Sequence, residues 1–588
     1  DLGMHCADLG LQPFSVLPPF NTLNAEVVER GSTGGNKPRR LGPAEVELRY
    51  SAASNPNDPV GPDSINSTSQ NFPVGATVEN ATLAKTDFWD LVGAQTVAAL
   101  LFPGLNPLGD EGLQTIANAD HGRYMPGIAD PYNANDPQAF SAYEEAFERF
   151  TAQGIPATNI DDAGRHNSYP LMRVQAVSTV TQDVVATVDM VTPVSAEVDC
   201  RDCHTMGEVG ADPGARAGGP TFVAPASPSR RDVEAAAKTN ILRLHDYKHG
   251  GVTGPLDGGS PVLCAGCHAS PALSSVGGPG GDPSVALMSQ VMHAYHGLLQ
   301  VDAGDALVRD GGGEPVLRDP QDPLAKPLIP VGPGVPMEQN CFLCHPGKVT
   351  QCFRGAMFAA GQTCASCHGT MLSVGGTFAL AQGGEPGTGQ RRPWTDEPRC
   401  ESCHTGAAEP KTLAYDPNDP AATPILAADK RFAEQPGTLY RNSRGHGGLQ
   451  CEACHGSPHA IWPNPNPDAN DNVAAIQLQG HAGVIGECST CHTSLSSSAG
   501  LGGPHGMHPV NNPSWIKGGG NFHGEVYKEG SGDSCAACHG ADHRGTRLSR
   551  TLANRVMRDA EGQLRAILPA GAEVSCGLCH SVAKSFDD

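Results

Sequence analysis

Residues 341–369 read CFLCHPGKVTQCFRGAMFAAGQTCASCHG and contain one pattern twice: a cysteine, two variable residues, a second cysteine and a histidine. The same pattern occurs seven more times, so the chain of 588 residues holds nine copies. In chain order, motifs 1 to 9 occupy residues 200–204, 264–268, 341–345, 364–368, 400–404, 451–455, 488–492, 535–539 and 576–580. These motifs decide how the rest of the sequence is interpreted.

The spacing within each motif has a chemical reason. Two thiols three residues apart can add to the two vinyl groups on one edge of a porphyrin, and the adjacent imidazole then lies under the iron as an axial ligand. The motifs therefore predict nine covalently bound haems of the c type. The attaching residues are Cys200, Cys203, Cys264, Cys267, Cys341, Cys344, Cys364, Cys367, Cys400, Cys403, Cys451, Cys454, Cys488, Cys491, Cys535, Cys538, Cys576 and Cys579, and the axial ligands are His204, His268, His345, His368, His404, His455, His492, His539 and His580. Zinc sites also use Cys-x-x-Cys hairpins, but they do not require a histidine directly after each second cysteine.

The cysteine count indicates the compartment. Of 20 cysteines, 18 belong to motifs, which leaves Cys6 and Cys352 as either one long-range disulfide or two buried thiols. Haem attachment of this kind takes place outside the cytoplasmic membrane. The chain begins at Asp1 without a charged and then apolar leader, which is typical of a mature exported protein. We therefore expect an extracellular or cell-surface protein, otherwise a periplasmic one, with no membrane span because no run of 18 apolar residues occurs.

The chain is acidic, with a formal net charge of −23 to which haem propionates would add. This charge argues against nucleic acid or an anionic membrane as a partner.

The motifs divide the chain into two predicted domains. Residues 1–196 contain no motif and 197–588 contain all nine. We expect a mixed fold: a β-rich N-terminal domain for docking or assembly, followed by a loop-rich, mostly α or irregular region whose core is the stacked haems. Alternation at 46–50 and two β-rich runs at 171–177 and 184–191 predict strands and a hairpin. Asp136, Pro137 and the aromatic spacing from Phe140 to Phe150 predict an inserted helix that packs in the core.

Fourteen histidines outside the motifs could supply a second axial ligand to every iron. Helices predicted over 232–250 and 282–297 would carry two such histidines each, on one face. Two others follow a motif histidine by four residues and would reach a neighbouring iron, and the rest lie in glycine-flanked loops or near the N-terminus. The candidates are His245, His249, His293, His296, His446, His459, His481, His505, His508, His523, His543 and His5, while His121 and His166 lie far from any motif and are expected to be structural.

Two further ligand questions stay open at this level. Met292 and Met507 are competing axial ligands, although Met/His ligation fits single-haem carriers better. The acidic loops 463–470 and 415–420 are candidate calcium sites, which turn chemistry explains equally well.

The nine motifs, the additional histidines and the stretch 341–369 resemble the large exported multihaem c-type cytochromes of metal- and electrode-respiring prokaryotes. The resemblance covers residues 200–580 and implies haems stacked into a continuous path for electrons. It also implies partners that are redox proteins, an extracellular electron acceptor or further copies of the chain, since some members polymerise into conductive filaments. This chain departs from the better-known filament subunits in haem number and in its large haem-free N-terminal domain. The rival function is a multihaem reductase acting on nitrite, hydroxylamine or a sulfur oxyanion at one haem with an open sixth position. A purely structural surface protein would leave the haems unexplained.

Overall fold

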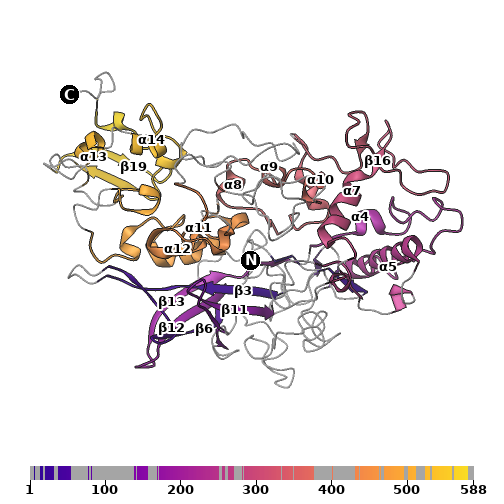
Figure 1. The fold of residues 1–588 in the computed structure, drawn as a ribbon, viewed down its shortest axis with the longest axis horizontal. Helices are drawn as coiled ribbons and strands as arrows, with labels where there is room; N and C mark the ends of the chain where they lie inside the picture. The colour runs from indigo at the N-terminus through magenta and orange to yellow at the C-terminus, as the bar shows by residue number, and fades with distance from the viewer. Residues whose placement is uncertain are drawn as a thin grey trace.

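The computed structural model is elongated, with the N-terminal sheets on one side of the long axis and the motif-bearing region along it (Figure 1). It describes residues 5–6, 13–16, 20–31, 37–53, 77–78, 81–82, 138–140, 142–156, 168–169, 171–195, 197–250, 255–258, 262–269, 281–282, 284–332, 334–347, 350–375, 400, 431–435, 438–461, 464, 469–495, 501–510, 515, 523–529, 533–558 and 562–580. Small antiparallel sheets and helices are both present, so the fold is mixed as expected.

Two antiparallel sheets form the N-terminal part. One has the order β13-β12-β6-β9 and the other β10-β11-β3. Their strands are β3 (Phe20–Ala25), β6 (Val46–Ala53), β9 (Gln138–Ala139), β10 (Ala142–Glu144), β11 (Arg149–Pro156), β12 (Leu171–Ser178) and β13 (Val184–Val191). The hairpin predicted at 171–191 is confirmed, with Leu171 opposite Val191 in the β12-β13 pair.

Both sheets contribute to one hydrophobic core. Side chains from β6 and β12 meet side chains from β3 and β11 there, and the buried members are Leu23, Val46, Leu48, Tyr50, Phe150, Ala152, Met172, Val174 and Ala176. The alternation in 46–50 is confirmed, because Val46, Leu48 and Tyr50 are each only 2–3 % exposed. Burial of these side chains stabilises the sheets without any cofactor.

The helix predicted from residue 136 is wrong. Strands β9, β10 and β11 occupy this stretch, and a turn over 145–148 joins β10 to β11. Tyr143 lies directly opposite Phe150 across that pair, with ring centroids 4.9 Å apart. A spacing of seven residues suits one helix face, but it also suits two cross-strand partners around a tight turn. The prediction that these aromatic residues belong to the core is confirmed for Phe140, Tyr143 and Phe150, and Asp136 and Pro137 lie outside the described residues.

The region after residue 197 is built from short helices and turns. Its α-helices are α4 (Arg201–His204), α5 (Arg230–His249), α7 (Tyr295–Leu298), α8 (Ala356–Ala359), α9 (Cys364–His368), α10 (Met371–Val374), α11 (Cys451–His455), α12 (Val473–Gln479), α13 (His523–Glu529) and α14 (Asp533–His539). Small two-stranded pairs join distant segments, as in β1 (His5–Cys6) with β14 (Val194–Ser195), β2 (Phe14–Ser15) with β15 (Val262–Leu263), and β18 (Arg555–Arg558) with β19 (Leu564–Leu568). Further pairs are β4 (Val27–Glu29) with β5 (Arg39–Leu41), β7 (Thr77–Val78) with β8 (Ala81–Thr82), and β16 (Gln300–Val301) with β17 (Lys326–Pro327).

The helix predicted over 232–250 is present as α5, which begins two residues earlier, at Arg230. The Ser229 side chain accepts a hydrogen bond from the Asp232 backbone N–H at the start of α5, and Gly250 ends the helix in the left-handed conformation. The second predicted helix begins later than expected. Asp282 accepts hydrogen bonds from Ser284 in a turn, helical residues start at 288, and a π-helical segment η3 (Gln290–Ala294) leads into α7. Asp282 is satisfied within that turn, so it does not cap the helix.

The N-terminal sheets pack against the part of the chain that carries motifs 6 and 7. The Asp189 backbone N–H donates to the Gln477 side chain of α12 at 2.7 Å, and the Gln477 amide donates back to the Asp189 carboxylate at 2.9 Å. Glu26 accepts a hydrogen bond from the backbone N–H of Gln450, and Gly31 forms a bridge with His492. The part of the chain without motifs thus contacts the motif region directly.

Within the described residues, no helix is long and apolar enough to cross a bilayer.

Candidate cofactor site

One continuous cavity of about 4390 Å³ runs through the motif region, and residues from all nine motifs line it. Divided by nine, this volume is about 490 Å³ for each motif, which lies within the range of about 300–1,000 Å³ for a pocket holding one small molecule or cofactor. Motif 5 contributes Cys400, while its Cys403 and His404 lie outside the described residues. The cavity is therefore large enough for one large planar group at every motif.

Every described motif histidine faces a histidine from outside the motifs. Some pairs join segments that are distant in sequence, and others join adjacent elements. In every pair the two imidazole centroids are 5.7–6.4 Å apart. The pairs are His204 with His296, His268 with His245, His345 with His293, His368 with His459, His455 with His505, His492 with His446, His539 with His508 and His580 with His523.

These separations fit a metal ion held between two imidazoles. A metal–imidazole nitrogen bond is about 2.0–2.1 Å long, so two opposed bonds put the nitrogens about 4 Å apart and the ring centroids about 6 Å apart. In one pair the facing atoms are His455 Nε2 and His505 Nε2, at 3.5 Å. A shift of about half an ångström would open this pair to the required distance.

The other ring nitrogen of many of these histidines is held by a backbone carbonyl. His296 Nδ1 lies 2.5 Å from the Met292 oxygen, and His505 Nδ1 lies 2.7 Å from the Arg431 oxygen. The same contact occurs at 2.9 Å for His268, His293, His523 and His539. Because a carbonyl can only accept, Nδ1 carries the proton, and Nε2 is then the ring nitrogen whose lone pair could bind a metal.

Burial keeps several of these imidazoles neutral. Burial lowers the pKa of His204, His459 and His508 to about 4. The neutral ring is the form that coordinates a metal.

The motif thiols are also held in a neutral form. Burial raises the pKa of Cys451 to about 11 and that of Cys454 to about 12. A thiolate is therefore disfavoured at these positions, whereas a thioether carries no charge and has no such burial penalty.

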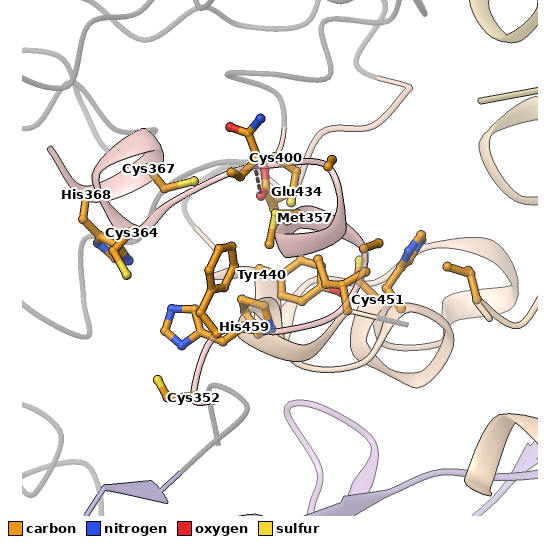
Figure 2. A pocket seen from close by; sticks show the side chains of 18 of the residues that line it. Cys352, Met357, Cys364, Cys367, His368, Cys400, Glu434, Tyr440, Cys451 and His459 are labelled. Atoms are coloured by element: carbon orange, nitrogen blue, oxygen red, sulfur yellow. Dashed lines mark hydrogen bonds between the residues drawn. The ribbon is translucent and has the colours of Figure 1, made fainter. Parts of the chain in front are cut away.

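Motif 4 illustrates the arrangement (Figure 2). Its cysteines, Cys364 and Cys367, lie on α9 with His368, and His459 reaches the same part of the cavity from the segment that follows motif 6. The two imidazole centroids are 6.1 Å apart. Nearby, the Cys400 backbone N–H donates to the Glu434 carboxylate at 2.7 Å, which connects the start of motif 5 to the same wall.

The remaining candidates have other surroundings. His249 is exposed, with its ring 4.8 Å from His245. His481 has contacts at both ring nitrogens, 3.1 Å from Glu487 and 2.8 Å from the Ala482 carbonyl, and its predicted role as a ligand stays a prediction. His543 is buried beside Tyr527, with ring centroids 5.5 Å apart.

Several predictions fall outside the described residues. They concern His121, His166, the side chain of His5, the acidic loop 415–420 and most of the loop 463–470. Met292 and Met507 line the cavity, but histidines face the motif histidines beside them. In the described ranges, no group of three or more histidine, cysteine or acidic side chains clusters as a zinc or calcium site would require.

Sequence reasoning named all eight partner histidines but not their pairing. It did not predict the carbonyl groups that accept hydrogen bonds from the histidine Nδ1 atoms, because every residue has a backbone carbonyl and the sequence does not show which one is in contact. One partial signal exists: His293 and His296 share a helical segment, which suggests two neighbouring sites.

Comparison with known proteins adds no relative. No protein-family model matches the chain, and no curated protein or solved structure is significantly similar to it.

Proposed function

We propose that the protein carries electrons over a long distance through nine covalently bound c-type haems, most of them held between two histidines. The observation that carries this proposal is that all eight described motif histidines face a second histidine at a metal-bridging distance in one shared cavity. When bound, each haem would supply reversible one-electron chemistry. The chain's own part is to fix spacing, axial ligation and burial.

The first four motifs are linked side by side. His293 and His296 lie on one helical segment and face motifs 3 and 1, respectively. The side chain of Asn240, on the same helix α5 that carries the motif 2 partner His245, donates to the His204 carbonyl at 3.0 Å. Motifs 3 and 4 meet at Cys341 and Cys364, whose thiols lie close enough to shift each other's pKa. The supported order at this end is motifs 2, 1, 3 and 4.

Sharing continues through the second half. His459 faces motif 4 and follows the motif 6 histidine by four residues, while His505 and His508, three residues apart, face motifs 6 and 8. Charge on Cys491 adds to the burial that raises the pKa of Cys454, so motifs 6 and 7 are neighbours.

Motifs 8 and 9 are also neighbours, and they end the row, by which we mean the nine motifs in their spatial order. After burial, charge on Cys576 is the next largest effect raising the pKa of Cys535. Cys400, the described residue of motif 5, lies near both motifs 4 and 6, because charges on Cys451 and Cys367 contribute to its raised pKa after burial and Glu434. The early motifs and the late motifs therefore lie toward opposite ends of the long axis, as the positions of α5 and α14 indicate (Figure 1).

We further propose that the protein is exported and acts at the cell surface or beyond it. It would exchange electrons with other redox proteins, with an extracellular acceptor or with further copies of itself in a filament. The N-terminal sheets would serve docking or assembly, since they pack on the segment carrying motifs 6 and 7.

Carbon monoxide binding to the reduced protein separates this function from the reductase alternative. Eight irons with two imidazoles each have no open position, so we expect at most one bound carbon monoxide per chain, and that one at motif 5. Potentiometric titration should at the same time take up nine electrons per chain. Carbon monoxide uptake by several irons would contradict the proposal, and turnover of nitrite or hydroxylamine would favour the reductase.

A further inference from the structure

Two cysteines take no part in the motifs, and the fold brings them together. Cys6 and Cys352 are 346 positions apart in the sequence, from 352 minus 6. Their thiols lie close enough to shift each other's pKa. Neither residue has the cysteine spacing or the following histidine that haem attachment requires, since Ala7 and Phe353 come next.

Backbone pairing places the first of these cysteines. Strand β1 pairs in parallel with β14, and Cys6 lies directly opposite Ser195. The Ser195 hydroxyl is 2.5 Å from the hydroxyl of Thr350, and the backbone N–H of Thr350 donates to Glu197 at 2.9 Å. These contacts fix the N-terminal strand against the loop that contains the second cysteine.

The second cysteine is held just as firmly. The Cys352 backbone N–H donates to the Pro346 carbonyl at 3.3 Å, and its own carbonyl accepts from the Arg354 guanidinium at 3.2 Å. Arg354 is in turn paired with Asp471 at 2.5 and 2.8 Å, and both side chains are buried. Hydrogen bonds thus hold the backbone on both sides of the cysteine pair.

The two thiols affect each other's ionisation. Contact with Cys6 lowers the pKa of Cys352, and contact with Cys352 raises that of Cys6. A thiolate is the nucleophile in thiol–disulfide exchange, and either member of such a pair can begin the exchange.

A second thiol contact in the chain provides a contrast. Cys341 and Cys364 also lie close enough to shift each other's pKa, but both belong to motifs and would be consumed by thioether bonds. Their contact indicates that the haems proposed for motifs 3 and 4 would be neighbours. Cys6 and Cys352 have no such use.

We propose that Cys6 and Cys352 form a disulfide that fastens strand β1 to the loop between motifs 3 and 4. Two S–H bonds of this chain and the S–S bond of an exported thiol–disulfide oxidant protein break. The Cys6–Cys352 S–S bond forms, and the oxidant takes up the two electrons and the two protons as the S–H groups of its dithiol. The proposal rests on one part of the proposed function, namely that the motif cysteines carry haem and that the chain matures in an oxidising compartment.

The position of this bond suggests what it does for the row. Cys352 precedes Phe353, whose ring lies against the His459 ring with centroids 6.1 Å apart. His459 faces motif 4. Fastening Cys352 therefore holds the wall against which this axial histidine packs.

Peptide mapping of the native protein without reductant tests the proposal. Free thiols are alkylated under denaturing conditions before digestion. We expect one cross-linked species that joins the peptides of Cys6 and Cys352, two hydrogens lighter than their sum, and absent after reduction. Alkylated Cys6 and Cys352 alongside nine haem peptides would overturn the disulfide, whereas alkylated motif cysteines would instead overturn the proposed function.

Thermal unfolding gives a second test that does not depend on variants. With every iron already reduced, addition of a phosphine that cleaves disulfides should lower the Tm of the wild-type protein by several degrees. Cys6→Ser, Cys352→Ser and the double variant should share this lower Tm and show no response to the phosphine. A wild-type Tm that ignores the phosphine would overturn the proposal, even if the variants fail to fold.

Discussion

Replacing His245 by alanine should convert one iron from low spin to high spin. The His245 ring lies 6.3 Å from the ring of the motif 2 histidine His268, the distance that two opposed metal–nitrogen bonds require. Alanine removes one of these two ligands and leaves the thioether bonds and His268 in place. With nine motifs in the chain, about one ninth of the low-spin signal should be lost while the covalent haem content stays the same.

His249 provides a matched control on the same helix. It follows His245 by one helical turn, and the two rings are 4.8 Å apart. A ring displaced by this distance, close to the helical pitch of about 5.4 Å, cannot reach the same iron without moving α5. His249→Ala should therefore leave the low-spin signal intact, and His249 should not rescue the His245→Ala variant.

Electron paramagnetic resonance of the oxidised protein is the assay, because the angle between two axial imidazole planes shapes the low-spin signal. The His245 and His268 planes lie at 79°, whereas the His293 and His345 planes lie at 9°. Loss of His245 should remove a large-g signal typical of perpendicular planes, and His293→Ala should remove a rhombic one. An unchanged spectrum for His245→Ala, or the same loss for His249→Ala, would refute the pairing.

Other perturbations probe the packing around the row. Arg354→Leu removes the charged partner of the buried Asp471 carboxylate. Chemical unfolding should therefore show a free energy of unfolding lower by about 3–5 kcal/mol, and a decrease under about 1 kcal/mol would contradict the buried pair. Gly355→Ala adds a Cβ 2.2 Å from the Ile461 carbonyl oxygen, whereas at Gly361, which has a similar positive φ, the Cβ meets nothing within 4 Å. The first variant should lose more stability than the second, whose cost is about 1–2 kcal/mol from backbone conformation alone. Chains produced without haem attachment should keep the circular dichroism of the N-terminal sheets and lose protease resistance after residue 197, because the N-terminal core needs no cofactor. Equal protection of both parts would contradict that division.

Local signals in the sequence predicted local structure well. The helix predicted over 232–250 is present as α5, and the β12-β13 hairpin follows from two β-rich runs separated by a short polar turn. In each case the deciding residues lie within a few positions of the element that they determine. Such signals survive in almost any tertiary setting.

Elements that depend on contacts between distant segments were predicted less well from the sequence. Tyr143 and Phe150 have helical spacing, but their segment forms strands instead. In that segment β11 pairs with β3, and β9 pairs with β6. Tertiary pairing overrides an amphipathic pattern in this way when the partner strands lie far away in sequence.

Which histidine faces which motif histidine could not be predicted from the sequence, for a similar reason. His505 faces a motif histidine 50 residues before it, while His245 precedes its own by 23. No fixed spacing connects a motif to its partner. The sequence therefore limits the candidates, and only the fold brings the two rings of each pair together.

The intact mass of the purified chain in denaturing, acidic solvent tests the central claim most directly. Thioether bonds survive such treatment, so the account predicts a polypeptide that retains nine haem groups. A chain that releases its pigment into organic solvent, or that carries far fewer than nine groups, would contradict the account.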